Sequence, residues 1–305
     1  MKNRFHRRLL YTMLIVLDRA FLLIPYNIAL DIGKFFGGLI FILLGKYRRL
    51  TKNHLRSALG ASMDEKEISR IAQSVFVNLA MGFTEVLSLP KIKNRLDTII
   101  ELKGVEKVDK ILQEGKGMIA VSGHLGNWEL IPMYFAYRGY SSNVVARPVY
   151  YEKYDEWVSF LRKSMGVNVI YRTDSPKKLL RLLKDNEILG ILADQDIDSI
   201  EGVFVDFFGK KARTSTAPVK LAMASGAPIV PIFIIRNGKK HTMVVEDPIR
   251  VERSVDREKA VLSYTQIWSD VLESYIRKYP QQWVWMHRRW KSRPPQSTPS
   301  YNIKE

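Results

Sequence analysis

The sequence of 305 residues predicts an α/β protein: a mixed, partly parallel β-sheet flanked by helices, with a hydrophobic helical region before it. From residue 98 onward, short apolar segments of strand-like composition alternate with helical stretches, which is typical of a sheet with parallel strands. The N-terminal region is apolar and basic, which predicts hydrophobic helices. The hydrophobic content of 46% is enough for a buried core, so a wholly disordered chain is excluded.

The N-terminal region, residues 1–60, holds three uncharged runs, at residues 9–17, 20–30 and 35–45. Each run is shorter than the ~18 apolar residues that identify a membrane-spanning helix. Eleven Lys and Arg against two Asp surround these runs, and such basic flanks suit anionic lipid headgroups. We therefore predict a membrane-associating region, either an in-plane anchor or one imperfect span within residues 9–30. Two buried core helices are the alternative, and the pattern does not fit a cleaved signal peptide.

Residues 61–293 are predicted to form the main domain. Helical periodicity begins at a capping pattern in Ser62–Glu65 and runs to about Leu89, where Pro90 closes it. The expected strands are 98–103, 117–122, 142–146, 167–171, 188–193, 228–234 and 242–246. Helices are expected at 104–114, 127–138, 152–165, 175–186, 216–225 and 256–279. The polar, proline-rich segment 294–305 is predicted to be a disordered tail.

Several classes of protein are excluded by what the sequence lacks. The absence of cysteine excludes a disulfide scaffold, a thiolate metal site, an iron–sulfur cluster and a cysteine nucleophile. The sequence has no G-x-S-x-G nucleophile elbow, no P-loop and no H-E-x-x-H zinc motif. The net charge of +17 is not accompanied by a nucleic-acid-binding module, so nucleic acid is not an expected partner.

The stretch Ser122–Glu129 carries the main candidate for chemistry. His124 follows a buried-looking strand, at the edge of the sheet where α/β proteins place their sites, and a histidine there is suited to general base catalysis. Glu129 lies five residues later in the first turn of the next helix, from which its carboxylate would fold back and orient the imidazole. Gly126 permits the sharp turn, and free N–H groups near Asn127 would hold an oxyanion or a phosphate. The alternative is a turn histidine and a favourable first-turn charge.

This stretch resembles the active-site motif of the bacterial lipid A acyltransferases, the lauroyl/myristoyl transferase family. That family is a branch of the glycerolipid (lysophospholipid) acyltransferases in which Glu replaces the Asp of the usual H-x-x-x-x-D motif. The resemblance continues in order along nearly the whole chain. The further matching blocks are Arg147-Pro148, Arg162 with Gly166, Asp194-Gln195-Asp196, Phe204–Thr214, Leu221–Pro228 and Tyr279–Lys291.

The resemblance implies transfer of a fatty acyl chain from acyl carrier protein or coenzyme A to a hydroxyl of a membrane glycolipid, most simply a lipid A precursor. It also implies a location at the bacterial inner membrane, with the catalytic domain on the cytoplasmic face. His124 would deprotonate the acceptor hydroxyl for direct attack on the thioester, with Glu129 orienting it, and no acyl-enzyme would form. Besides the acyl thioester as co-substrate, no cofactor and no metal are expected.

Arg162 and Asp194 match further family residues with functional weight. Arg162 suits a phosphate or the thioester oxygen, and Asp194 would orient an arginine or contact sugar hydroxyls. A structural arginine–carboxylate pair is the alternative. Weaker candidates for substrate binding lie in the loops that surround these residues. They are Gly126, Asn127, Arg147, Asp196, and Lys210 and Arg213 of a basic loop that would meet an acidic carrier protein or a lipid phosphate.

In the C-terminal block, Trp283, Trp285 and Trp290 lie close in sequence to several basic residues. We predict that it lies at the lipid headgroup layer, packs on the core as a helix, or does both. His287 is interpreted as structural or headgroup-facing. Two other functions stay open: the same chemistry on a phosphatidylinositol mannoside or lysophospholipid, and a non-catalytic membrane-binding module, against which the complete set of candidate residues argues.

Overall fold

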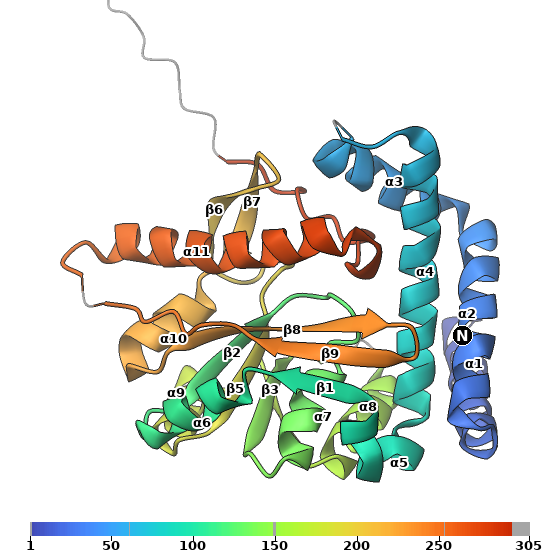
Figure 1. Cartoon of the computed structure of the whole chain (residues 1–305), viewed down its shortest axis with the longest axis horizontal. Helices are drawn as coiled ribbons and strands as arrows, with labels where there is room; N and C mark the ends of the chain where they lie inside the picture. The colour runs from blue at the N-terminus through green and yellow to red at the C-terminus, as the bar shows by residue number, and fades with distance from the viewer. Residues whose placement is uncertain (1, 61, 149–150, 253, 295–305) are drawn as a thin grey trace, which may run out of the picture.

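A seven-stranded sheet forms the centre of the computed structural model, which describes residues 2–60, 62–148, 151–252 and 254–294 (Figure 1). The strand order is β1-β9-β8-β2-β5-β3-β4, and all neighbours are parallel except β8 and β9. A separate antiparallel hairpin is formed by β6 and β7. The strands are β1 (Ile100–Lys103), β2 (Met118–Ser122), β3 (Ser142–Ala146), β4 (Val167–Tyr171), β5 (Ile188–Leu192), β6 (Gly202–Phe207), β7 (Lys210–Ser215), β8 (Ile229–Asn237) and β9 (Lys240–Val245).

Helices surround this sheet and precede it in the chain. The α-helices are α1 (Lys2–Leu23), α2 (Tyr26–Leu43), α3 (Gly45–Leu59), α4 (Glu65–Leu87), α5 (Leu89–Ile92), α6 (Val105–Gln113), α7 (Leu130–Tyr137), α8 (Glu152–Ser164), α9 (Pro176–Lys184), α10 (Ala217–Ser225) and α11 (Arg257–Lys278), and the 3-10 helices are η1 (Lys93–Thr98) and η2 (Pro280–Gln282). The predicted fold class is thereby confirmed: a mixed, mostly parallel sheet flanked by helices.

The sheet separates two hydrophobic cores, because side chains alternate along a strand. On β2, Ile119 and Val121 face a core built with α9, α10 and α11, whereas Met118 and Ala120 face a core built with α6 and α7. The sheet is therefore covered on both faces, as a mostly parallel sheet requires.

Helices α1 and α2 lie along α4, at the side of the sheet, and α3 crosses α4 near the top of the view (Figure 1). Pro25 stands before α2 and divides residues 9–30 between α1 and α2, so the expected single span within those residues is not formed. Instead, α2 is the one described helix that is long and apolar enough to cross a membrane by length and composition, and 28% of it is buried.

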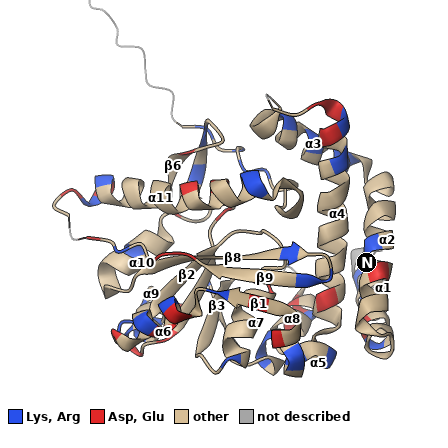
Figure 2. Ribbon diagram, viewed as in Figure 1, with Lys and Arg blue, Asp and Glu red and all other residues tan. Residues whose placement is uncertain are grey.

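Much of the apolar surface of the described residues is concentrated on these helices. Fifteen of the twenty-one large hydrophobic side chains that are exposed lie between residues 9 and 47, on α1, α2 and the start of α3. Figure 2 shows that α2 is almost free of charge, whereas α3 carries several Lys and Arg. A concentration of exposed apolar side chains of this kind is typical of an interaction surface.

The structure corrects two local predictions, the cap of α4 and the number of strands, and leaves the domain boundary and the tail as predictions. Helix α4 begins one residue after Asp64, whose side chain accepts a 2.7 Å bond from the N–H of Glu67, so Asp64 and not Ser62 caps it. The β6–β7 hairpin was not expected. The domain boundary at residue 60 stays a prediction; Leu30 and Leu55 from before it lie in the two cores. Apart from Pro294, the tail predicted for 294–305 lies outside the described residues.

Candidate active site

His124 and Asp194 meet because their strands are parallel neighbours. In the register of β2 and β5, Ser122 lies opposite Leu192. The residues two positions further on, His124 and Asp194, therefore lie side by side at the same edge of the sheet. His124 Nδ1 lies 2.6 Å from Asp194 Oδ1, and the carboxylate of Asp194 is completely buried. Its second oxygen, Oδ2, accepts bonds from the backbone N–H of His124 at 2.8 Å and from the indole N–H of Trp283 at 2.9 Å.

These contacts define the state of the pair. Burial alone would raise the pKa of the Asp194 carboxyl, but the His124 ring and the hydrogen bonds from His124 outweigh it and hold that pKa well below its ordinary value. An ionised Asp194 accepts a hydrogen bond from the N–H at Nδ1, and in the tautomer that this bond favours, the lone pair on Nε2 is the basic atom.

Glu129 does not contact the imidazole, which corrects the expectation that it orients His124. Its carboxylate forms a bidentate pair with Arg162, at 2.6 Å from Nη2 and 3.0 Å from Nε. Glu129 immediately precedes α7, and from there its side chain meets α8, which carries Arg162. The expected contact of Asp194 with an arginine or with sugar hydroxyls is replaced by its contacts to His124 and Trp283. The carboxylate partner of Arg162 is thus Glu129.

A second histidine lies on the other side of His124. The amide nitrogen of Gln195 is 3.2 Å from His124 Nε2 and 2.9 Å from His287 Nε2, and the two rings are 4.9 Å apart. Burial, followed by the charge of His124, lowers the pKa of His287 to about 4, so this ring is neutral near pH 7. Sequence reasoning missed the contacts of Gln195 and Trp283, although both residues lie inside blocks that match the family.

The C-terminal segment fixes the loop that carries His124. The N–H of Val284 donates to the carbonyl of His124 at 3.1 Å, and the N–H of Gly126 donates to the carbonyl of Gln282 at 3.0 Å. Gly126 has φ +61°, and a Cβ there would lie 1.9 Å from the carbonyl oxygen of Ile234, so only glycine fits.

This segment also corrects an expectation about the membrane. Trp283 and Trp285 are completely buried, so neither lies at the headgroup layer. Beyond the short η2, the described part of the block is not helical. It packs in the core because both indoles find hydrogen-bond acceptors there: Asp194 for Trp283, and the carbonyl of Pro280 for Trp285 at 2.7 Å.

Several predicted substrate contacts are occupied by the protein itself. Asp196 accepts bonds from the N–H and the hydroxyl of Ser292, at 2.8 and 2.9 Å. Arg213 donates to two carbonyls of the chain after β5, those of Ile197 and Ile200, at 2.7 and 2.6 Å. Lys210 is exposed and contacts the hydroxyl of Ser57. Asp196 and Arg213 therefore hold loops, whereas Lys210 and Arg147 are exposed, and Arg147 lines the cavity described below.

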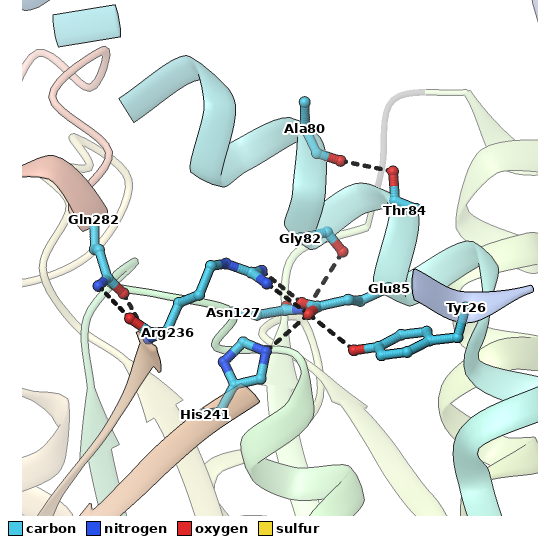
Figure 3. A network of polar contacts seen from close by, with 9 residues as sticks. All are labelled: Tyr26, Ala80, Gly82, Thr84, Glu85, Asn127, Arg236, His241 and Gln282. Atoms are coloured by element: carbon cyan, nitrogen blue, oxygen red, sulfur yellow. Dashed lines mark hydrogen bonds and ion pairs between the residues drawn. The ribbon is translucent and has the colours of Figure 1, made fainter. Parts of the chain in front are cut away.

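Asn127 belongs to a buried network centred on Glu85 of α4 (Figure 3). Arg236 of β8 forms a bidentate pair with Glu85 at 2.6 and 2.7 Å, and His241 Nε2 of β9 lies at 2.8 Å. Tyr26 of α2 donates to the same carboxylate at 3.2 Å, and Asn127 donates at 2.7 Å. Burial would raise the pKa of Glu85, but His241 and Arg236 hold it well below its ordinary value. The network joins the N-terminal helices, the sheet and the His124 loop.

A deep cavity of about 370 Å³, here called the main cavity, opens beside His124 and lies on the α7 face of the sheet. Gln195, Glu129 and Arg162 lie with His124 at its polar end. Its walls come from β3, β5 and α7. They include Ser142, Val144, Ala146, Ile188, Gly190, Leu192, Ile131 and Pro132.

Two further cavities border the main cavity. A side cavity of about 240 Å³ lies between α4 and α8, and the Glu129–Arg162 pair lines both it and the main cavity. A lateral cavity of about 450 Å³ lies between α9 and α10, and it shares Arg172 and Gln195 with the main cavity. Among the residues that the structure describes, no cluster of three His, Asp or Glu is placed to hold a metal ion.

The comparisons with known proteins show the family to which the chain belongs. A family model for "Bacterial lipid A biosynthesis acyltransferase" matches residues 2–292. This match places the chain in the acyltransferase class. The chain belongs to the bacterial lipid A biosynthesis acyltransferase family, which confirms the resemblance found in the sequence.

The individual relatives share only a modest part of their sequence with this chain. The lipid A biosynthesis lauroyltransferase of Escherichia coli is 26% identical over 276 residues, which cover 89% of this chain and 88% of that protein. The phosphatidylinositol mannoside acyltransferase of Mycobacterium tuberculosis is 27% identical over 216 residues, covering 68% of this chain and 66% of that protein. A solved structure, the 1-acyl-sn-glycerophosphate acyltransferase of Thermotoga maritima, has a TM-score of 0.38 and 13% identity, and the match covers 84% of this chain and 97% of that one.

Proposed function

We propose that this chain transfers a fatty acyl chain from an acyl thioester to a hydroxyl group of a membrane glycolipid, with His124 as general base. The observation that carries the proposal is that the basic atom of the His124–Asp194 pair stands at the polar end of a deep apolar cavity. Family membership supports acyl transfer to a lipid. The cavity offers space for the fatty acyl chain, and the His124–Asp194 pair supplies a base that can activate the acceptor hydroxyl.

The chemistry needs one base and one site for negative charge. His124 Nε2 takes the proton of the acceptor hydroxyl while its oxygen attacks the thioester carbonyl, and a tetrahedral oxyanion forms. When the oxyanion collapses, the carbon–sulfur bond breaks and the thiol leaves with the proton from the imidazolium. Arg162, oriented by Glu129, and the N–H groups of Trp128 and Glu129, which have no acceptor among the described residues, are the candidates to hold the oxyanion.

The main cavity is proposed as the acyl-chain site. Leu192 at the open end of β5 lies four positions along the strand from Ile188, which corresponds to ~13 Å of depth. Gly190 stands between them, and a Cβ there would lie 3.3 Å from the Asn143 carbonyl and 3.4 Å from Val144. The missing side chain at Gly190 therefore keeps the middle of the cavity open.

Gly190→Val should shorten the acyl chain that is transferred. The new side chain would occupy the middle of the cavity, so the rate with long-chain thioesters should fall more than the rate with short ones. Competition among thioesters of different chain length, with mass spectrometry of the product, measures this. Ile188→Ala, which enlarges the far end, is the matched variant and should shift the preference toward longer chains. If both variants keep the chain-length profile of the wild type, the main cavity is not the acyl-chain site.

The donor and the acceptor are proposed from the family. We propose acyl carrier protein or coenzyme A as donor and a lipid A precursor as acceptor, as the name of the E. coli relative suggests. The mycobacterial relative favours a second acceptor, a phosphatidylinositol mannoside. The lipid profile of a deletion strain, measured by mass spectrometry, separates the two acceptors, because the missing acylated lipid identifies the substrate.

We propose that α1, α2 and α3 hold the enzyme on the cytoplasmic face of the inner membrane. The exposed apolar side chains of α1 and α2 would enter the lipid, and the basic residues of α3 would contact anionic headgroups. Tyr11 of α1 contacts the rings of Tyr151 and Tyr154 at the start of α8. Because α8 also carries Arg162, this surface lies near the opening through which a lipid would reach the site.

Reversing two charges on α3 should weaken binding to anionic vesicles. Lys46 and Arg49 are exposed, whereas Arg48 bonds to the carbonyls at the end of α2 and is left unchanged. Lys46→Glu with Arg49→Glu removes about 1 kcal/mol of attraction per residue and adds repulsion. Co-sedimentation with phosphatidylglycerol vesicles measures the loss, and Lys110→Glu with Lys116→Glu, exposed residues at the other end of the molecule, is the control. Equal binding of wild type to neutral and anionic vesicles would refute the electrostatic contribution.

A further inference from the structure

Two arginines leave the same edge of the sheet together, beside the site. Strands β3 and β4 are parallel, with Ala146 opposite Tyr171, so the next residues, Arg147 and Arg172, stand in equivalent positions. The N–H of Arg172 donates to the carbonyl of Ala146 at 2.9 Å, which ties the two strand ends to each other. The placement repeats that of His124 and Asp194 at the ends of β2 and β5.

Arg172 and Arg147 differ from Arg162 because no carboxylate in the described part of the chain balances their charge. The Nε and Nη1 of Arg172 are buried and have no hydrogen-bond partner, and no carboxylate among the described residues pairs with Arg172 or with Arg147. By contrast, Arg162 and Arg236 each hold a carboxylate with two nitrogens. Burial, and then the charge of Arg147, lower the pKa of Arg172. Unpaired buried N–H groups beside a second positive charge are unfavourable unless an anion accepts their hydrogen bonds and balances the charge.

The position of this pair connects it to the reaction. Arg147 and Arg172 both line the main cavity, which His124 also lines, and Arg172 lines the lateral cavity as well. An anion held there would lie beside the space in which the thioester and the acceptor hydroxyl meet. The carboxylates of the site are already engaged, Asp194 with His124 and Glu129 with Arg162.

We propose that Arg147 and Arg172 form a site for a phosphate group of a substrate. Guanidinium groups match phosphate oxygens in a planar, bidentate geometry, and two of them suit one phosphate. This inference rests on the proposed function, because it assigns the phosphate to a reactant of acyl transfer. The donor carries phosphate on its pantetheine arm, and a phosphorylated lipid acceptor carries it on its headgroup.

The first experiment does not depend on activity. Titration of the detergent-solubilised full chain with inorganic pyrophosphate should give binding that Arg172→Gln weakens about 10- to 100-fold, the loss expected for hydrogen bonds to a charged group. Arg181→Gln is the control, since Arg181 is exposed on the neighbouring α9 and contacts Asp185. Pyrophosphate binding that is equal in wild type and Arg172→Gln overturns the proposal.

The second experiment identifies which reactant carries the phosphate. KM is compared for acyl-coenzyme A and S-acyl-pantetheine, which lacks phosphate, and for acceptors with and without a phosphate. A preference for one phosphorylated partner that disappears in Arg172→Gln, and is partly restored in Arg172→Lys, assigns the site to that partner. If Arg172→Gln alters neither preference, the proposal is overturned. If the chain transfers no acyl group at all, the pyrophosphate titration still decides whether the anion site exists.

Discussion

Asp194→Asn should lower the turnover of acyl transfer by about 10²- to 10⁴-fold, with the KM for the acyl donor nearly unchanged. The carboxylate of Asp194 lies 2.6 Å from His124 Nδ1 and stabilises the imidazolium that forms when Nε2 takes the proton of the acceptor. A neutral amide keeps the size of the side chain but removes the charge, and it no longer defines which ring nitrogen carries the proton. Steady-state kinetics on protein with an unchanged circular dichroism spectrum measures the effect.

Glu129→Gln is the matched control, because it makes the same chemical change at the carboxylate that was expected to orient His124. Glu129 contacts Arg162 and not the imidazole, so its loss of turnover should be smaller than that of Asp194→Asn. A larger loss for Glu129→Gln than for Asp194→Asn would contradict the pairing of His124 with Asp194.

Glu85→Ala should lower the free energy of unfolding by about 3–5 kcal/mol, because it leaves the guanidinium of Arg236 buried without a partner. Glu85 is completely buried and holds side chains from α2, β8, β9 and the His124 loop, so the variant also loses contacts that join four parts of the chain (Figure 3). Chemical denaturation of the detergent-solubilised protein, followed by tryptophan fluorescence, measures the change.

Glu114→Ala provides the comparison for that variant. Glu114 forms the same bidentate geometry with Arg250, at 2.5 and 2.8 Å, but the pair is largely exposed to solvent. Exposed pairs contribute between about 0 and 1 kcal/mol, so Glu114→Ala should change the stability little. Similar effects of the two substitutions would mean that Glu85 is not the centre of a stabilising network.

The sheet was predictable because strand and helix periods alternate clearly from residue 98, and each expected strand corresponds to an observed one. The β6–β7 hairpin was missed because its basic and aromatic residues do not alternate between apolar and polar. For Trp283 and Trp285, the expected position at the headgroup layer was wrong, whereas the expected packing on the core was right. Tryptophans beside arginines in a sequence are typical of a segment at the headgroup layer. Only the fold shows that Asp194 and the carbonyl of Pro280 accept the hydrogen bonds of the two indoles, those of Trp283 and Trp285.

The candidate site was predictable as a set of residues but not as a set of contacts. His124, Glu129, Arg162 and Asp194 do lie together. Their pairing, however, depends on strand order, since β5 is the neighbour of β2 although some 65 residues separate them in sequence. Spacing along the chain suggested Glu129 as the partner of His124. The parallel register supplied Asp194 instead, and no property of the local sequence predicts which strands are adjacent.

Direct acyl transfer by His124 is tested by an acyl-transfer assay on the purified full chain and on His124→Ala. Labelled acyl thioester is supplied with and without the lipid acceptor, and the lipid products and the intact protein are analysed by mass spectrometry. We expect a lipid one acyl chain heavier with wild type, a turnover at least about 10²-fold lower with His124→Ala, and no acyl adduct on the protein. Full activity of a folded His124→Ala protein, or a stoichiometric acyl adduct on Ser122, would contradict direct transfer by His124.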